Sequence, residues 1–457
     1  MASTSTEPNS TSSIKKLAIR GAIWTTAGYG ISLVLRFASN IVLTRWLEPD
    51  LFGLMSLVYV FIVGLHLFSD LGLNTSVVQN KRGDEPAFLN TAWSLQILRG
   101  LLLWGICLVI AIPVSQFYGE PRLAILLPIV GFNAVLSGFN STSLFTLNRH
   151  LSVKQLALFE LSSQIVSLAV MLIWARISPS IWALVIGGTV SAVFQLIVSH
   201  RLNKGERNRP IWDATAVHEL LHFGKWIFLS TALTFLANQS DRLFLGKLFS
   251  LELLGVYGIA FTLSDMPRSL LLAMSSKVIY PSYARMIDLP RPEFREKVLR
   301  NRKPILLPLA IGLAVFIGFG DLLIHLLYDE RYTAASWMLP LLALGTWPII
   351  LTQTVDSILM AMGKPQYGTL GYFFGFLCYA IGIPLGFSLA GPLGAIVAVS
   401  MSYLPSWIVI TWGLKRERAS VFRQDMLMTA VFLTALALTL GTRFSFNLQN
   451  MVNHFTQ

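Results

Sequence analysis

Composition places this chain in a membrane. Apolar residues make up 54% of its 457 residues and charged residues only 13%, with a mean hydropathy of +0.63. This balance excludes an ordinary soluble globular protein. The formal net charge of +12 does not indicate a nucleic-acid partner, because membrane proteins concentrate Lys and Arg on their cytoplasmic side.

In chain order, the sequence predicts a disordered tail and then a first lobe of six helices. Residues 1–13, MASTSTEPNSTSS, are small and polar and lack the apolar stretch of a secretory signal, which predicts a short cytoplasmic tail. Residues 14–204 form the predicted N-terminal lobe. Its apolar runs are long enough to span a bilayer and lie at 21–47, 52–78, 88–116, 121–147, 155–176 and 181–200. A basic cytoplasmic linker is predicted at 205–218.

The second predicted lobe, residues 219–415, repeats this organisation. Its six runs lie at 221–249, 252–276, 304–328, 333–362, 367–389 and 392–413. A thirteenth run at 426–442 predicts an extra apolar helix and tail over residues 416–457. With the amino terminus in the cytoplasm, most of the 35 Lys and Arg residues fall on the cytoplasmic side of this map, as the positive-inside rule requires. The sequence thus predicts an all-α polytopic membrane protein with twelve spans plus one.

The first span carries polar side chains along one face. Spacings of three and four residues place them on one side of an α-helix, at Tyr29, Ser32, Arg36, Ser39 and Asn40. A polar stripe returns 202 positions later, at Thr231, Thr234, Asn238, Asp241 and Arg242, and Gly53 likewise matches Gly255. Similarity at a fixed offset predicts two pseudo-symmetric halves with a substrate site where they meet. The alternative is a chance match between two polar helices.

Several longer blocks resemble one transporter family. The run LTRWLEPDLFGLMSLVYVFIVGLHLFSDLGLNTSVVQ at 43–79 resembles the opening of the oligosaccharide-repeat-unit flippases, the polysaccharide-transport branch of the multidrug/oligosaccharidyl-lipid/polysaccharide exporter superfamily. Three further blocks are similar to successive parts of the exopolysaccharide-type members, namely TAWSLQILRGLLLW at 91–104, FYGEPRLAILLPIV at 117–130 and IWALVIGG at 181–188.

The resemblance implies a transporter and not an enzyme. It implies movement of undecaprenyl-diphosphate-linked oligosaccharide repeat units from the inner to the outer leaflet of the bacterial inner membrane, for exopolysaccharide or lipopolysaccharide O-antigen biosynthesis. The implied mechanism is alternating access through a cationic cavity between the lobes. The implied partners are the lipid-linked oligosaccharide, membrane lipids, a polysaccharide polymerase and a chain-length regulator.

Four arginines within predicted spans are the candidate ligands of the diphosphate: Arg36, Arg99, Arg242 and Arg268. Arginine suits this task because its fork of donors binds phosphate oxygens bidentately and keeps its charge in a cavity. The repeat aligns Arg36 with Asn238 and Asn40 with Arg242, so we expect Arg36 and Arg242 to form an anion clamp. The alternative is a set of ion pairs that hold helices together, with Asp241 beside Arg242 and Asp265 three residues before Arg268.

Acidic residues within spans are costly and suggest ion coupling or gating. Asp70, in FSDLGLN, and Asp356 are candidates for coupling, and Asp70 also suits a local helix break beside Gly72. Asp321 and His325 stand four residues apart near the outer face, which predicts a protonatable pair, an outer gate or a structural pair. Asp241 and Asp265 complete the set. Glu160 lies near the inner surface, where pairing with a basic loop residue is expected.

Other functional classes have less support in the sequence. It holds no GxxxxGK[ST] phosphate loop, no HExxH motif and no Cys or His cluster with metal-ligand spacing, so no cofactor or metal is expected. An ion-coupled drug or cation antiporter of the same superfamily is one alternative, although it would favour acids over arginines in the lobes. A membrane-embedded polysaccharide polymerase or glycosyltransferase is the other, but it would need a substantial external loop and every predicted one is short.

Overall fold

The protein is a bundle of helices in two compact units. The computed structural model describes the chain except for residues 1–9, 70–71, 151, 203–207, 276–278 and 456–457. Helices account for 86% of the chain and no strand occurs among the described residues, which confirms the all-α prediction. Most of the predicted tail lies outside the described residues, and the first helix already begins at Ser10.

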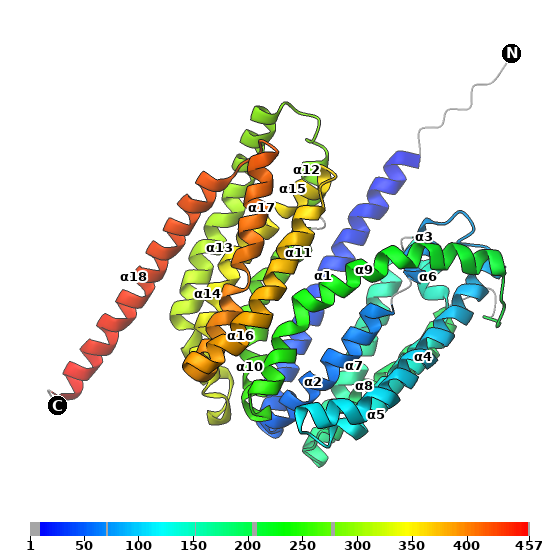
Figure 1. The fold of residues 1–457 in the computed structure, drawn as a ribbon, viewed down its shortest axis with the longest axis horizontal. Coiled ribbons are helices and arrows are strands. Elements are labelled where there is room, and N and C mark those ends of the chain that lie inside the picture. Colours follow the sequence, from blue (N-terminus) through cyan, green and yellow to red (C-terminus); the bar gives the residue numbers. More distant parts are fainter. Residues whose placement is uncertain (1–9, 70–71, 151, 203–207, 276–278, 456–457) are drawn as a thin grey trace. The chain divides into compact units, whose positions relative to one another are not determined.

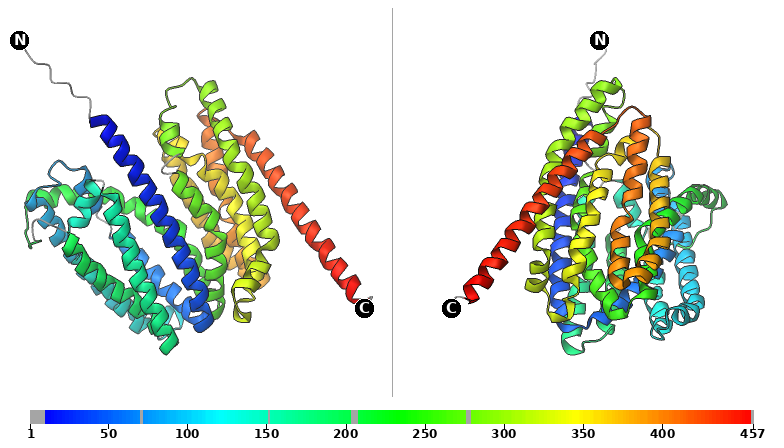
Figure 2. Two further views of the ribbon diagram at one scale, coloured as in Figure 1. Left: turned by 180° about the vertical axis from the view of Figure 1, so that it is seen from behind. Right: turned by 60° about the vertical axis from the view of Figure 1, so that its left-hand side comes forward.

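The first unit comprises Met1–Leu47 and Val58–Ala232. In it α4 packs along α5, α7 packs along α8, and α1 packs along α7, as Figures 1 and 2 show. Its helices are α1 (Ser10–Trp46), α2 (Pro49–Phe68, shared with the second unit), α3 (Leu73–Gln79), α4 (Pro86–Tyr118), α5 (Leu123–Gly138), α6 (Ser143–Arg149), α7 (Val153–Ile177) and α8 (Trp182–Leu202). Local signals set several ends. Pro49 opens α2, where proline's missing N–H costs nothing, and left-handed Gly119 (φ +71°) closes α4.

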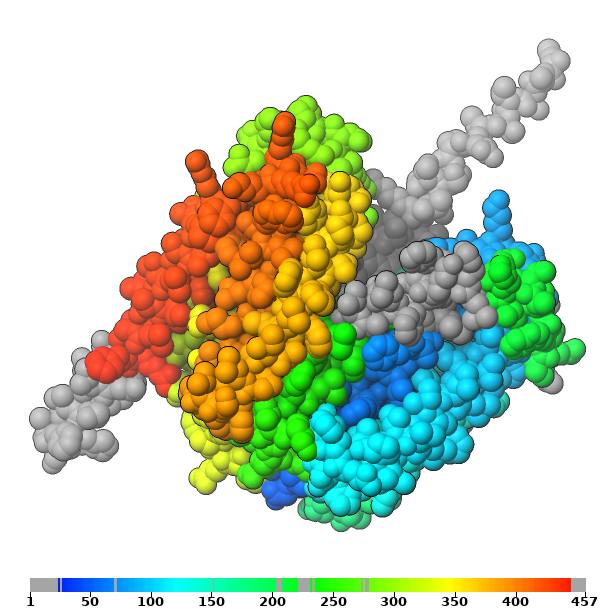
Figure 3. All heavy atoms as spheres, in the orientation of Figure 1, coloured from blue at the N-terminus to red at the C-terminus, as the bar shows by residue number. Residues whose placement is uncertain are grey.

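The second unit comprises Glu48–Leu57 and Leu233–Gln457. Its helices are α9 (Ala214–Leu248, shared with the first unit), α10 (Leu251–Ser264), α11 (Met266–Met274), α12 (Tyr280–Ala284), α13 (Arg291–Leu327), the 3-10 turn η2 (Glu330–Tyr332), α14 (Ala335–Gln353), α15 (Asp356–Ala361), α16 (Gln366–Met401), α17 (Leu404–Arg416) and α18 (Phe422–Phe455). In the space-filling view of Figure 3, α16 and α17, in orange tones, cover much of the visible face of this unit.

Helix α18 is part of the core of the second unit. It packs along α13, and the ring of Phe432 stacks on Trp347 of α14 at a centroid distance of 4.9 Å. The indole of Trp347 also donates to Thr429 Oγ1. The extra apolar helix predicted after the twelfth span is therefore an integral part of the C-terminal unit.

Many helices are long and apolar enough to cross a membrane. Nine stretches of the described chain meet this criterion, or ten if α5 and α6, bent by 63°, form one span. They include Phe422–Phe444 of α18 and the 51-residue stretch Gln366–Arg416. The latter is broken at Ala390 and Gly391, whose φ angles of −140° and +59° are not helical, at the turn that the sequence predicts between its eleventh and twelfth spans. A multi-pass membrane protein is confirmed, while the count of twelve plus one remains a prediction.

Two glycines mark the internal repeat. Helix α1 ends at Trp46 and α2 begins at Pro49, whereas α9 ends at Leu248 and α10 begins at Leu251, each 202 positions later. A Cβ on Gly53 would lie 1.9 Å from the carbonyl oxygen of Leu251. A Cβ on Gly255 would lie 1.9 Å from the carbonyl oxygen of Pro49. This reciprocal backbone contact within the second unit follows the offset found in the sequence.

The described part of the linker docks on α4 of the first unit. Its residues 205–207 lie outside the described part of the chain, and α9 already begins at Ala214. Between them, the amide N–H groups of Arg209, Ile211 and Asp213 donate to Asn90, Ser94 and Thr91 of α4. These bonds hold the chain across the first turns of α4.

Arg82 clamps the end of this docked segment. Its guanidinium pairs with Asp213 at 2.9 Å, with Glu219 at 3.3 Å and with Glu85 at 2.8 Å. Hydrogen bonds from Thr215 and Arg82 hold the pKa of the Asp213 carboxyl well below its usual range. A depressed carboxyl pKa stabilises the docked form above the ordinary value of about 3.9, and this contribution is lost as the pH falls through that region.

Replacing Arg82 with glutamine is expected to loosen the docked segment. The variant loses three ion pairs of exposed or half-buried groups, so trypsin cleavage at Lys204 and Arg207 should accelerate roughly two- to ten-fold while the bundle stays folded. Limited proteolysis of the detergent-solubilised protein measures the rate. Arg176→Gln, a change at an exposed arginine of the same unit, serves as control. Equal rates in both variants would show that Arg82 does not hold the linker.

Candidate functional site

A candidate cavity of the first unit surrounds Arg36. It has a volume of about 340 Å³ and lies between α1 and α7. Its lining residues are Gly28, Tyr29, Ser32, Arg36, Asn148, Val153, Leu156, Ala157, Glu160, Leu161 and Gln164. The polar stripe predicted on the first span therefore lines a cavity at three of its positions.

Hydrogen bonds brace Arg36 from one side. Arg36 Nη2 donates to Ser32 Oγ at 3.1 Å, and Ser32 Oγ donates to Gln164 Oε1 at 2.5 Å. Gln164 Nε2 returns a bond of 2.9 Å to the carbonyl oxygen of Ser32. Over the described residues, no acid lies within ion-pair distance of Arg36, and its side chain is exposed to the cavity. The alternative of a helix-holding ion pair therefore lacks a partner in that part of the chain.

A second cavity of the first unit, of about 280 Å³, contains Arg99. Arg99 Nη2 donates to the carbonyl oxygen of His66 at 2.8 Å, and its Nε donates to Ser69 Oγ at 3.0 Å. These acceptors lie at the end of α2, where the chain breaks before left-handed Gly72 (φ +60°) and α3. A cation is favourable there because the last carbonyls of a helix lack partners and carry partial negative charge.

The predicted helix break near Asp70 is present, between α2 and α3. Asp70 itself lies outside the described residues, so its proposed capping or coupling role stays a prediction. The side chain of Thr234, in the second polar stripe, also lies outside the described part of the chain. Asn40 is half-buried on α1 and is not among the residues that line the Arg36 cavity.

A smaller cavity of about 50 Å³ in the second unit contains Arg268, Asn238 and Asp356. Arg268 forms an ion pair with Asp265. Its Nε lies 2.5 Å from Asp265 Oδ1 and its Nη2 lies 3.2 Å from Oδ2. The structure therefore contains the ion pair between Asp265 and Arg268 that the sequence spacing offered as the alternative to diphosphate binding. Asp356 begins α15, directly after the break that follows α14. Gln353 Oε1, beside it, is buried without a hydrogen-bond donor among the described residues.

Arg242 and Asp241 bind different partners. The Asp241 side chain is only 2% exposed and accepts a hydrogen bond from the hydroxyl of Tyr257. Arg242 Nη1 donates to Gln239 Oε1 at 2.9 Å, and its guanidinium lies 5.3 Å from the centre of the Phe261 ring. Adjacent residues of a helix point in different directions, which explains the separate contacts. Arg36 belongs to the first unit and Arg242 to the second, so the predicted clamp stays a proposal.

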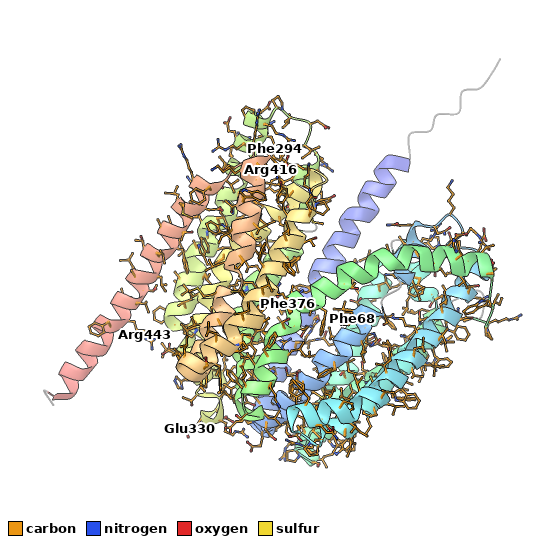
Figure 4. The ribbon with its side chains drawn as sticks, viewed as in Figure 1. Phe68, Phe294, Glu330, Phe376, Arg416 and Arg443 are labelled. Carbon is orange, nitrogen blue, oxygen red and sulfur yellow. The ribbon has the colours of Figure 1, made fainter. Side chains whose placement is uncertain are left out.

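Asp321 binds Arg443 and not His325, so the predicted pairing of Asp321 with His325 is wrong. Arg443 of α18, labelled in Figure 4, binds both carboxylate oxygens of Asp321 and also donates to the Gly318 carbonyl oxygen at 2.9 Å. His325 Nε2 lies 3.4 Å from Ser336 Oγ instead. A bidentate guanidinium is a stronger partner for a carboxylate than an imidazole one turn away, and α18 supplies it.

Comparison with known proteins identifies the family of this chain. The profile of the family described as "Polysaccharide biosynthesis protein" matches residues 42–337, which is more than half of the sequence. The chain belongs to this polysaccharide biosynthesis protein family. The resemblance identified from residues 43–79 and the three later blocks is thereby confirmed.

Relatives of this polysaccharide biosynthesis family align over most of the chain. The lipopolysaccharide biosynthesis protein WzxC of Escherichia coli (strain K12) is 22% identical over 407 residues, covering 87% of this chain and 80% of the relative. The succinoglycan biosynthesis transport protein ExoT of Rhizobium meliloti (strain 1021) is 20% identical over 351 residues, covering 76% and 70%. Among solved structures, the lipid II flippase MurJ in an inward closed conformation has a TM-score of 0.71 at 12% identity, covering 93% of this chain and 99% of that one. The two therefore share a fold.

In this family member, part of the Arg36 cavity was not predicted from the sequence. Gln164, which bonds Ser32 from α7, was not among the predicted site residues, and Glu160 was predicted to pair with a basic loop residue. The structure places Glu160 in the cavity wall, and no ion pair of this side chain occurs in the described part of the chain. Their spacing of four residues puts both on one face of the span, and that was the signal that could have revealed them.

Proposed function

We propose that this protein is a flippase for undecaprenyl-diphosphate-linked oligosaccharide repeat units. It moves them from the inner to the outer leaflet of the bacterial inner membrane for exopolysaccharide or O-antigen biosynthesis, with its amino terminus in the cytoplasm. The family membership and the fold shared with a lipid II flippase support this function. The observation that carries it is Arg36, an arginine without a described acidic partner, in a cavity of about 340 Å³ that several polar side chains also line, within an apolar helical unit.

The chemistry of the substrate explains why such a cavity is needed. A sugar headgroup and a diphosphate lose their hydrogen bonds and solvation in hydrocarbon, at a cost of several kcal/mol for each unsatisfied group. A polar route with fixed positive charge replaces those lost interactions. Arg36 suits this role best, because Arg268 is neutralised by Asp265 and Arg99 is engaged by the end of α2.

The remaining candidates extend the route. Arg99, Arg242 and Arg268, with Asn40 and Asn238, contribute further positive charge and amide donors, and Arg36 and Arg242 act together as the clamp. Alternating access between the lobes exposes this path first to one leaflet and then to the other. An ion gradient drives the cycle, with Asp70 and Asp356, the latter in the small C-terminal cavity, as coupling acids. Further groups for coupling or gating are Asp241, Asp265, Asp321 and His325. A polymerase and a chain-length regulator use the product.

Removing the clamp charges is expected to abolish export. Loss of charge-assisted hydrogen bonds to a phosphate costs about 1.5–3 kcal/mol each, so Arg36→Ala should reduce flipping roughly 10- to 100-fold, and the Arg36→Ala, Arg242→Ala double variant should reduce it further. In spheroplasts of a deletion strain, an impermeant sugar-modifying probe measures the outer-leaflet pool of lipid-linked repeat units. Wild type should restore this pool and the double variant should not.

Two controls sharpen this experiment. Arg176→Ala removes an exposed arginine near the end of α7 and should leave the outer pool intact. Arg36→Lys keeps the charge without the bidentate fork and should be intermediate. If deletion leaves the outer pool unchanged and raises drug sensitivity instead, the protein is an antiporter of the shared fold and the flippase proposal fails.

A further inference from the structure

The wall of the Arg36 cavity also contains an acid. Glu160 lies two turns into α7 and lines the same cavity of about 340 Å³. It is exposed there, and the described residues include no ion pair of either Glu160 or Arg36. A base and an acid that share one cavity without bonding to each other are both available to a ligand.

Three of the neighbouring polar side chains, Ser32, Gln164 and Asn148, already have hydrogen-bond partners. Gln164 and Ser32 satisfy each other through two hydrogen bonds that join α7 to α1. Asn148 donates to Asn74 Oδ1 at 3.3 Å. The groups with the most unused hydrogen-bonding capacity are therefore the guanidinium of Arg36, which only donates, and the carboxylate of Glu160, which only accepts.

This pair of groups fits a glycosyl phosphate. Phosphate oxygens accept hydrogen bonds and match Arg36, whereas sugar hydroxyls donate and match Glu160. A bare diphosphate would bring negative charge towards the carboxylate without supplying a donor. The cavity volume of about 340 Å³ corresponds to roughly ten water molecules at liquid density, which leaves room for a sugar ring beside the phosphate.

We propose that Glu160 accepts hydrogen bonds from hydroxyl groups of the sugar attached to the diphosphate, and that it makes the cavity select glycosylated lipid over bare lipid diphosphate. This inference rests on the proposed flippase function. The glycosylated lipid gains a hydrogen bond from a sugar hydroxyl to the charged Glu160 carboxylate, and a bare lipid diphosphate, which has no hydroxyl there, does not gain it. Glu160 is thus a specificity-determining residue, and Arg36 provides affinity for both lipids.

Binding to the purified full-length protein in lipid nanodiscs tests this assignment. The two probes are undecaprenyl diphosphate and the lipid-linked oligosaccharide extracted from the deletion strain. Wild type is expected to prefer the glycosylated lipid at least tenfold. Glu160→Ala should reduce this preference about tenfold or more, by weakening the glycosylated lipid alone. Glu160→Gln, which keeps one acceptor oxygen, should fall between them.

The remaining variants separate the two proposals. Arg36→Ala should weaken both lipids, and Glu252→Ala, at an exposed acid of α10, should change neither. The inference is overturned if wild type shows no preference, or if Glu160→Ala weakens the binding of both lipids equally or of neither. Glu160 then does not recognise the sugar. If wild type binds neither lipid, or Arg36→Ala leaves both affinities unchanged, the proposed function of the cavity fails instead. A single monodisperse peak in size-exclusion chromatography confirms that each variant is folded.

Discussion

Replacing Asp425 with alanine is expected to destabilise the second unit by about 3–5 kcal/mol, because it leaves a buried guanidinium without its counter-ion. Arg302 and Asp425 are both completely buried and form an ion pair between α13 and α18. Arg302 also donates to Thr354 Oγ1 and to the Leu351 carbonyl oxygen, each at 2.7 Å. The indole of Trp407 donates to the second oxygen of Asp425 at 2.9 Å. The Asp425 carboxylate on α18 thus connects, directly or through Arg302, to α13, α17 and the end of α14.

Thermal unfolding of the detergent-solubilised protein measures this loss, and Glu296→Ala, at an exposed acid of α13, is the control. Asp425→Asn keeps an acceptor and should be milder than Asp425→Ala. The Arg302→Met, Asp425→Leu double variant removes both charges and should recover much of the stability, because desolvating the pair costs free energy that an apolar pair does not require. A single Asp425→Ala variant as stable as Glu296→Ala would contradict the central role of this ion pair.

Adding one methyl group at Gly53 or Gly255 is expected to be nearly as damaging. An ideal Cβ at either position would lie 1.9 Å from a carbonyl oxygen of the facing helix, a distance at which backbone must move. Overpacking of this kind costs typically 1–3 kcal/mol, and more where backbone cannot yield. Gly53→Ala and Gly255→Ala should each lower the melting temperature and reduce export, because α2 and α10 can no longer approach each other as closely.

The same helix offers a matched control for this prediction. Gly258 lies one turn after Gly255 on α10, and a Cβ there would meet nothing within 4 Å. Gly258→Ala should therefore be neutral or slightly stabilising, since alanine favours a helix over glycine by about 1 kcal/mol. The melting temperatures and the outer-leaflet pools of lipid-linked repeat units, measured for the three alanine variants, test this prediction. If Gly255→Ala is as harmless as Gly258→Ala, the close crossing of α2 and α10 is not a constraint in the working protein.

Features that lie within one helix, or that repeat along the chain, could be predicted from the amino-acid sequence. Apolar runs predicted an all-helical membrane protein, and the 202-residue offset matched Gly53 with Gly255, which both lie where α2 and α10 approach closely. The three-residue spacing of Asp265 and Arg268 likewise indicated their ion pair. These features were accessible because helical periodicity places near neighbours on one face whatever surrounds the helix.

Contacts between residues far apart in the chain depend on how the helices pack. Arg302 counts in the sequence as one more base of a cytoplasmic segment, yet it is buried against Asp425, 123 positions away. Asp321 binds Arg443, 122 positions away, instead of His325 on its own helix. Glu160 and Arg36 likewise share a cavity because α1 packs on α7. Periodicity determines the face on which a side chain lies, but the partner across that face depends on how the helices pack, and no local pattern encodes that choice.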